Sequence, residues 1–221
     1  MTLWAHVYGG YASYDGAYEW GDYEHVAHKF VQILKGEPAN GYAWLPRPDG
    51  SKVKISTALA HAAVNVWGTW AAARAQQIYP NGGALLIPIP SASCLQLGAD
   101  PKGSALASAV ASRSTGFQAV NAIHWAEKLT KASKGGPRDA ETLFANARVL
   151  TGLEKLPVIL IDDVITGGGH ATACARALRC FGHDVQHVIA AARTVKAPPN
   201  AGMFSIEPWD LEANPYAAFF S

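Results

Sequence analysis

Residues 157–178, PVILIDDVITGGGHATACARAL, decide the fold of this chain. Four apolar residues at 158–161 predict a strand buried on both faces, and the glycines are followed by a helical pattern with Cys174 and Leu178 on one face. A buried strand that leads through a glycine-rich turn into a helix is typical of an open α/β sheet with parallel strands. Such sheets bind ligands at the carboxyl ends of their strands, so residues 162–170 form the candidate site.

The turn after this strand combines two kinds of polar group. Gly167, Gly168 and Gly169 permit a tight backbone whose N–H groups face an anion, and the following helix adds the positive end of its dipole. Asp162 and Asp163 would repel a phosphate, but they can accept hydrogen bonds from sugar hydroxyls or hold a hydrated Mg²⁺ ion. The pattern predicts a cradle for a ribose 5-phosphate; the alternative is an ordinary connection with solvated acids.

Short apolar runs and helical segments alternate on both sides of this motif. Further strands are predicted at 84–90 and 185–192, and helical spacing is present over 117–123 and 143–150. Alternation of this kind is the signature of βα units. It predicts an α/β core with a mostly parallel sheet over residues 81–195.

The first 80 residues differ from the rest in composition. Twelve of the twenty-two aromatic residues are Trp or Tyr before residue 80. A helix is predicted at 23–34, two short strands surround the Pro-Asp-Gly turn at 48–50, and an Ala-rich helix follows at 56–78. We expect residues 1–80 to be an added segment packed on the core, whereas the tail at 196–221 has too little periodicity to place.

The overall composition excludes several classes of protein. With 49% hydrophobic and 16% charged residues and a net charge of +1, the chain can bury a full core and does not resemble a disordered protein. No window supplies the clustered Lys and Arg of a nucleic-acid-binding face, so no such partner is expected. The uncharged run between Lys54 and Arg74 contains His61 and Asn65, which favours a buried helix over a membrane span.

The cysteines, the N-terminus and the absence of two nucleotide-binding motifs exclude further classes of protein. Cys94, Cys174 and Cys180 show neither CxxC spacing nor an even count, which favours a reducing compartment, and we expect a cytoplasmic protein. The N-terminus lacks the basic and apolar regions of a signal peptide. No Walker A sequence is present and no GxGxxG follows a strand, which argues against kinases and dehydrogenases.

The run VILIDDVITGGG at 158–169 resembles the phosphoribosyl diphosphate (PRPP) signature of the type I phosphoribosyltransferases. In that family a hydrophobic strand leads into an acidic pair, two apolar residues and a loop rich in Thr, Ser and Gly. The resemblance implies that Asp162 and Asp163 hold the ribose hydroxyls and, through water, Mg²⁺. The residues implied to hold the 5-phosphate are Thr166, Gly167, Gly168, Gly169 and His170. The match departs at Gly167, where the family usually has Thr or Ser, and at His170, where it usually has Thr.

Two weaker features occur in the family's order. The run ALLIPIPSAS at 84–93 ends in a small-residue turn, where the family builds a loop against the diphosphate. The matching residues are Ser91, Ala92 and Ser93, and Arg113 is a cation candidate for the same group. The run RSTGFQ at 113–118 resembles an element of the phosphoribosyltransferase-like proteins of the bacterial DNA-uptake (competence) group, which this chain resembles most in layout.

A polar stretch at 131–138 has the composition of a mobile lid. The resemblance implies that Lys134 and Arg138 are catalytic residues that stabilise the charge growing on the departing diphosphate. The alternative is an exposed, solvated surface loop.

The resemblance as a whole implies an α/β fold with the mostly parallel sheet of the type I phosphoribosyltransferase kind. The aromatic-rich segment is then the candidate hood for the base, although the general tendency of aromatic residues to be buried favours a place for its rings in the core. The implied activity is transfer of a 5-phosphoribosyl group from PRPP, with Mg²⁺, to or from a nitrogenous base or amine; the small-molecule acceptor stays open. The alternative is a non-catalytic module that binds a nucleotide or PRPP in regulation or DNA uptake. The resemblance also allows a homodimer.

Overall fold

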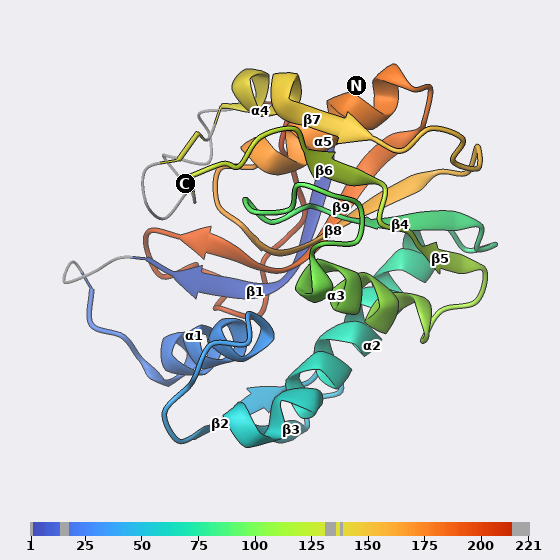
Figure 1. Cartoon of the computed structure of the whole chain (residues 1–221). Coiled ribbons are helices and arrows are strands. Elements are labelled where there is room, and N and C mark those ends of the chain that lie inside the picture. The colour runs from blue at the N-terminus through green and yellow to red at the C-terminus, as the bar shows by residue number, and fades with distance from the viewer. Residues whose placement is uncertain (1, 14–17, 131–135, 138, 214–221) are drawn as a thin grey trace.

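The computed structural model describes residues 2–13, 18–130, 136–137 and 139–213, and its centre is a six-stranded sheet (Figure 1). The strand order is β10-β1-β9-β8-β4-β5. The strands are β1 (Trp4–Ala12), β4 (Ala84–Pro88), β5 (Phe117–Ala119), β8 (Val158–Ile165), β9 (Val185–Val195) and β10 (Trp209–Asp210). All neighbouring pairs are parallel except β1 with β10. The predicted α/β fold with a mostly parallel sheet is confirmed.

Strand β8 lies inside the sheet because both of its faces are apolar. Residues 158–161 are buried, and they pair with β4 on one side and β9 on the other. The strand is longer than the predicted one, since it continues through the two acids to Ile165.

Helices cover the two faces of the sheet as two separate layers (Figure 1). One layer contains α1 (Asp22–Leu34), α2 (Ala60–Ile78) and α3 (Pro101–Ala111), and the other contains α4 (Ala140–Asn146) and α5 (Gly169–Cys180). Side chains of β8 point alternately to the two faces of the sheet. Ile159 and Ile161 pack in the core of the first layer, and Val158 and Leu160 pack in the core of the second.

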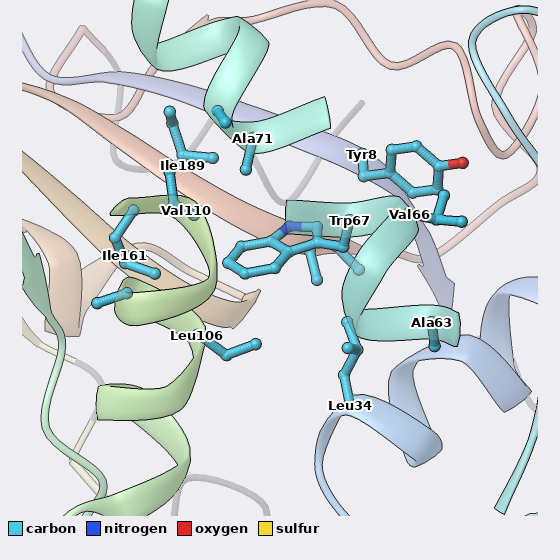
Figure 2. Packing of buried hydrophobic residues seen from close by; sticks show 14 of the residues in the cluster. Tyr8, Leu34, Ala63, Val66, Trp67, Ala71, Leu106, Val110, Ile161 and Ile189 are labelled. Atoms are coloured by element: carbon cyan, nitrogen blue, oxygen red, sulfur yellow. The ribbon is translucent and has the colours of Figure 1, made fainter. Parts of the chain in front are cut away.

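The core of the first layer is built around Trp67 of α2, which is fully buried. Figure 2 shows its indole between Leu106 and Val110 of α3 and the strand residues Ile161 and Ile189. The Ala-rich sequence of α2 lets this helix approach α3 closely, because small side chains leave room for the neighbouring backbone. At Gly68, for example, an added Cβ would lie 3.2 Å from the Ala109 carbonyl oxygen.

Two small antiparallel sheets of two strands each complete the fold. One pairs β2 (Tyr42–Pro46) with β3 (Lys52–Ser56), and the short helix η1 (Thr57–Leu59) then leads into α2, as expected from the Pro-Asp-Gly turn and the Ala-rich run. The other pairs β6 (Ile123–Trp125) with β7 (Ala147–Val149). The predicted helix at 23–34 is confirmed as α1.

The helical interpretation of residues 117–123 is wrong. Gly116 has φ of +80°, and the chain then forms β5 at the sheet edge beside β4, followed by β6. The helix expected over 143–150 is also shorter, because α4 ends at Asn146 and the following residues pair with β6. In both places pairing with a neighbouring strand decides the backbone conformation, although apolar residues recur at a helical spacing in the sequence.

The first segment contributes directly to the main sheet. Strand β1 lies between β9 and β10, so the sheet draws strands from all three of the predicted parts of the chain. The division at residues 80 and 195 stays a prediction. Among the helices in the described ranges, none combines the length and apolarity needed to cross a membrane.

Candidate phosphate and ribose site

The two acids lie at the carboxyl end of β8, between β4 and β9. The backbone N–H of Asp163 donates to Asp162 Oδ1 at 2.8 Å. Burial raises the pKa of Asp162 well above its ordinary value, and the charge of Asp163 raises it further. Burial, with a smaller contribution from Asp162, also raises the pKa of the Cys174 thiol on α5. The acidic pair is therefore a strained electrostatic arrangement that a cationic or hydrogen-donating ligand would relieve.

Two lysines from distant parts of the chain meet where α1 ends and α3 begins, and the charge of one of them acts on Asp162. Lys35 follows the last turn of α1, and its charge partly offsets the raised pKa of Asp162. Lys102, in the first turn of α3, donates to the Lys35 carbonyl oxygen. The Lys35 ammonium also lies 5.3 Å from the ring centroid of Tyr11. The sequence reasoning missed both lysines, because no local pattern marks them.

The glycine turn after β8 has one closed face and one open face. Gly168 has φ of +75° and forms the N-terminal cap of α5. A Cβ added at Gly168 would lie 2.8 Å from Cδ2 of Leu211, so the C-terminal segment closes that face. A Cβ added at Gly167 would meet nothing within 4 Å. An anion can approach the turn on the Gly167 side.

Thr166 and His170 flank the glycines. Thr166 is exposed, and its Oγ1 lies 2.9 Å from Thr194 Oγ1. His170 packs edge-on against Trp125, with ring centroids 5.7 Å apart, and burial lowers the pKa of its imidazole. A histidine with a lowered pKa is neutral at pH 7, so it can offer one N–H to a phosphate without adding charge.

Trp125 connects the turn with the loop after β4. Its indole Nε1–H donates to the carbonyl oxygens of Pro90, at 3.2 Å, and Ser91, at 3.0 Å. Since the same indole touches His170, the structure brings the residue 91–93 loop and the glycine turn together.

The residue 91–93 loop is already well bonded. The Ser91 N–H donates to Asp100 Oδ2 at 2.8 Å, and the Ala92 carbonyl accepts from the Leu129 N–H at 2.9 Å. Asp100 also caps α3 through the Gly103 N–H. Ser93 is exposed. One of the N–H groups expected to face a diphosphate is thus engaged by a carboxylate.

Arg113 lies at the other end of α3 from the residue 91–93 loop. It follows the carboxyl end of α3, whereas Asp100 and Ser91 lie at the amino end. Its guanidinium donates to Asn65 Oδ1 of α2 at 2.5 Å and to the Ala109 carbonyl at 2.6 Å. The other two cation candidates, Lys134 and Arg138, lie outside the described residues.

The acidic pair fits a Mg²⁺ ion that arrives with a ligand. Carboxylate oxygens are hard donors, and Mg²⁺ in phosphate sites uses one or two carboxylates together with waters and phosphate oxygens. Within the ranges described, no cluster of three or more His, Cys, Asp or Glu side chains could hold a metal. Asp162 and Asp163 can supply the protein's share of such a shell, directly or through water.

The aromatic residues of the first segment divide between the core and the site. Tyr8 is buried against Phe30 and Trp70. Tyr11 instead stacks on His28 with ring centroids 5.2 Å apart and planes inclined by 13°, and it lies under the Lys35 ammonium. Tyr11 therefore lies beside Lys35, and the role of this segment as a hood for the base stays a prediction.

No family model matches the chain, and no curated protein matches it. Among solved structures, the chain is similar to adenine phosphoribosyl transferase from Trypanosoma brucei in complex with AMP, pyrophosphate and ribose-5-phosphate, at 13% identity, with 81% of this chain and 84% of that chain covered and a TM-score of 0.43. For adenine phosphoribosyltransferase from Leishmania donovani the identity is 12%, the coverage 82% and 90%, and the TM-score 0.40. For a hypoxanthine phosphoribosyltransferase from Staphylococcus aureus the identity is 13%, the coverage is 65% of this chain and 68% of that chain, and the TM-score is 0.37. Similarity at this level carries no argument about function.

Proposed function

We propose that this protein is a phosphoribosyltransferase that uses PRPP and Mg²⁺ to transfer a 5-phosphoribosyl group to or from a nitrogenous base or amine. The observation that carries the proposal is the order of groups after the buried part of β8. Two adjacent carboxylates are followed by a turn with left-handed Gly168 and then by the first turn of α5. A ribose 5-phosphate presents hydroxyls and a phosphate on one rigid unit, so it needs acceptors beside an anion cradle.

The proposed roles follow from this order. Asp162 and Asp163 accept hydrogen bonds from the ribose hydroxyls and hold the hydration shell of Mg²⁺. The 5-phosphate enters on the open face at Gly167, where Thr166 and His170 supply side-chain donors beside the backbone N–H groups. The residue 91–93 loop, which Trp125 ties to the turn, faces the diphosphate.

The chemistry needs stabilisation of charge that develops during the reaction. When the bond from C1 to the diphosphate breaks, the ribose becomes oxocarbenium-like and negative charge grows on the leaving group. Mg²⁺, when bound, neutralises part of that charge. Asp162 and Asp163 keep the ribose oriented while the acceptor nitrogen approaches C1. Lys35, beside Asp162, favours the ionised form of that carboxylate and so its role as an acceptor.

A panel of purine and pyrimidine bases and amines, each with PRPP and Mg²⁺, tests the proposal through release of diphosphate. We expect one acceptor to give turnover, and Asp163→Asn to lower kcat/KM about 100-fold, because charge is lost with little change in shape. Asp184→Asn is the matched control, since Asp184 is exposed and precedes β9 at the opposite end of the sheet. It should leave turnover within about twofold.

A second candidate function is a non-catalytic module that binds a nucleotide or PRPP, in regulation or DNA uptake. The bonded state of the loop favours it, since the Ser91 N–H is held by Asp100 and Gly167 offers no hydroxyl. Saturable binding of PRPP with Mg²⁺, but no diphosphate release with any acceptor, would support this module over the enzyme. Absence of binding of both PRPP and nucleoside 5′-monophosphates would contradict both.

Lys134 and Arg138 are proposed to meet the departing diphosphate. The double variant Lys134→Ala/Arg138→Ala should lower kcat about 100-fold and change the Kd of PRPP less than about threefold, because the charge they stabilise is greatest in the transition state. The control is Arg148→Ala/Lys155→Ala, which removes two cations that donate to backbone carbonyls in other parts of the fold. Unchanged kcat in the first double variant would mean that residues 131–138 are a solvated connection.

A further inference from the structure

A groove of about 670 Å³ lies between the β2–β3 turn and α2. None of its lining residues belongs to the glycine turn or to the residue 91–93 loop. The side chains that give it chemical character are Arg47, Asn65, Thr69, Trp70, Arg74 and Gln77. Ligand pockets in proteins have volumes of roughly 300–1,000 Å³, so this groove can hold a molecule of nucleotide size.

The groove is positively charged. The lining contains two cations, Arg47 and Arg74, and one carboxylate, Asp49. Asp49 Oδ1 accepts hydrogen bonds from the Ser51 N–H at 2.9 Å and from the Ser51 hydroxyl at 2.7 Å. These hydrogen bonds hold the pKa of Asp49 below its ordinary value. They also engage Asp49 Oδ1 inside the β2–β3 turn. Arg113 does not line the groove, but its guanidinium donates to the side chain of Asn65, which does. An anion is the ligand that this charge distribution favours.

Arg74 carries the clearest sign of a missing partner. Its Nε is buried, and no hydrogen-bond acceptor for it is found among the residues that the structure describes. Its guanidinium carbon lies 6.0 Å from the ring centroid of Trp70. A buried guanidinium donor without an acceptor is costly. Because the Nε is closed to solvent, a phosphate in the groove would bond to the terminal nitrogens of the same guanidinium, which lines the groove.

The aromatic wall of the groove is held rigidly. Trp70 packs edge-on against Tyr8, with ring centroids 5.5 Å apart and planes inclined by 71°. Tyr8 is part of the buried cluster in Figure 2, and its hydroxyl donates to the Pro46 carbonyl oxygen at the end of β2. Tyr8 thus contacts both the end of β2 and the Trp70 ring of α2, so the indole needs little reorganisation to receive a ligand.

We propose that this groove is a second ligand site, which binds a phosphorylated aromatic or heteroaromatic molecule of nucleotide size. The phosphate bridges Arg47 and Arg74, because guanidinium groups bind phosphate through paired hydrogen bonds. The ring packs on Trp70, and the amides of Asn65 and Gln77 face its polar edge. The proposal is independent of the phosphoribosyltransferase activity, since the two sites share no residue.

The indole N–H signal of Trp70 in a ¹H–¹⁵N spectrum reports on the groove. The chain has seven tryptophans, so the signal is assigned by its loss in Trp70→Phe. The probes are AMP, adenosine and inorganic phosphate, added to the Gly167→Val variant so that the glycine turn is blocked. We expect AMP to shift the Trp70 signal saturably. Its affinity should be about tenfold higher than that of adenosine or of inorganic phosphate, because the binding free energies of the ring contact and the phosphate contact add.

Charge variants decide whether the arginines hold the phosphate. Arg47→Gln/Arg74→Gln should raise the Kd of AMP at least about tenfold, whereas Arg148→Gln, which removes a cation from β7, should leave it within about twofold. A Trp70 signal that does not respond to AMP, or an AMP affinity unaffected by the double variant, would overturn the proposal. Binding of AMP no tighter than adenosine would also overturn it. None of these results bears on PRPP turnover in the wild-type protein.

Discussion

Gly167→Val is expected to abolish binding of ribose 5-phosphate without destabilising the protein. Gly167 is not among the glycines with positive φ, and a Cβ there would meet nothing within 4 Å. A valine therefore fits the folded chain, but its side chain fills the open face on which the phosphate must approach the backbone N–H groups. We expect the affinity to fall at least about 100-fold and the Tm of the free protein to change by less than about 3 °C.

Gly168→Val should behave in the opposite way, because its cost lies in the fold. Its φ of +75° disfavours a β-branched side chain, and the added Cβ would lie 2.8 Å from Leu211. We expect the free energy of unfolding to fall by about 1–3 kcal/mol or more, before any effect on the ligand. Gly152→Val isolates the backbone part of that cost, since Gly152 has φ of +79° and open space around its Cβ position.

Calorimetric titration with ribose 5-phosphate, together with thermal unfolding of each variant, measures both effects. A Gly167→Val protein that binds as tightly as the wild type would show that the phosphate does not enter on this face. The cradle assignment would then be wrong, whatever the result for Gly168→Val.

The central motif was predictable because its structure is local. The apolar run at 158–161, the glycines and the helix that follows are adjacent in sequence, and the structure has them as β8, the turn and α5. The extension of β8 through Asp162 and Asp163 was not predicted, because acids rarely continue a buried strand. Pairing with β9 as far as Ile165 holds them in the sheet.

The place of β1 could not be predicted, because its glycines are required by a contact with residues that are remote in sequence. Gly9 and Gly10 interrupt the apolar pattern, yet both pair with β9. An added Cβ at Gly9 would lie 2.9 Å from Phe204, and one at Gly10 would lie 2.8 Å from Met203. The Gly10 N–H also donates to the Met203 carbonyl at 2.6 Å. The glycines make room for the C-terminal segment, which crosses β1 at this point.

The cations of the site were beyond local reasoning for the same reason. Arg113 begins a sequence element that resembles the family, but its guanidinium is bonded to α2. Lys35 and Lys102 have no motif, and they meet only because the carboxyl end of α1 packs against the amino end of α3. Charge placement depends on tertiary packing, and a single sequence does not encode it in any short pattern.

Asp162→Asn is expected to stabilise the free protein at neutral pH and to remove its Mg²⁺-dependent binding of PRPP. Burial and the charge of Asp163 raise the pKa of Asp162, so ionising this carboxyl costs folding free energy. Asparagine keeps the oxygen that accepts the Asp163 N–H, and its amide N–H can donate to the Asp163 carboxylate. We expect a gain of about 1 kcal/mol or more in the free energy of unfolding, or roughly 2–4 °C in Tm.

The gain should depend on pH in a direction that the raised pKa fixes. Below the ordinary value of 3.8 the carboxyl is protonated in both states, so the wild type and the variant have similar stability. As the pH rises further, the unfolded chain releases the proton first, and wild-type stability falls relative to the variant until the pH passes the raised folded pKa. Denaturant unfolding from pH 3 to pH 8 measures this difference. Asp184→Asn, which removes an exposed acid, is the control variant. Equal stability of wild type and Asp162→Asn across that range would mean that Asp162 ionises without cost, and the acidic pair would then not be poised to receive a metal or a ribose.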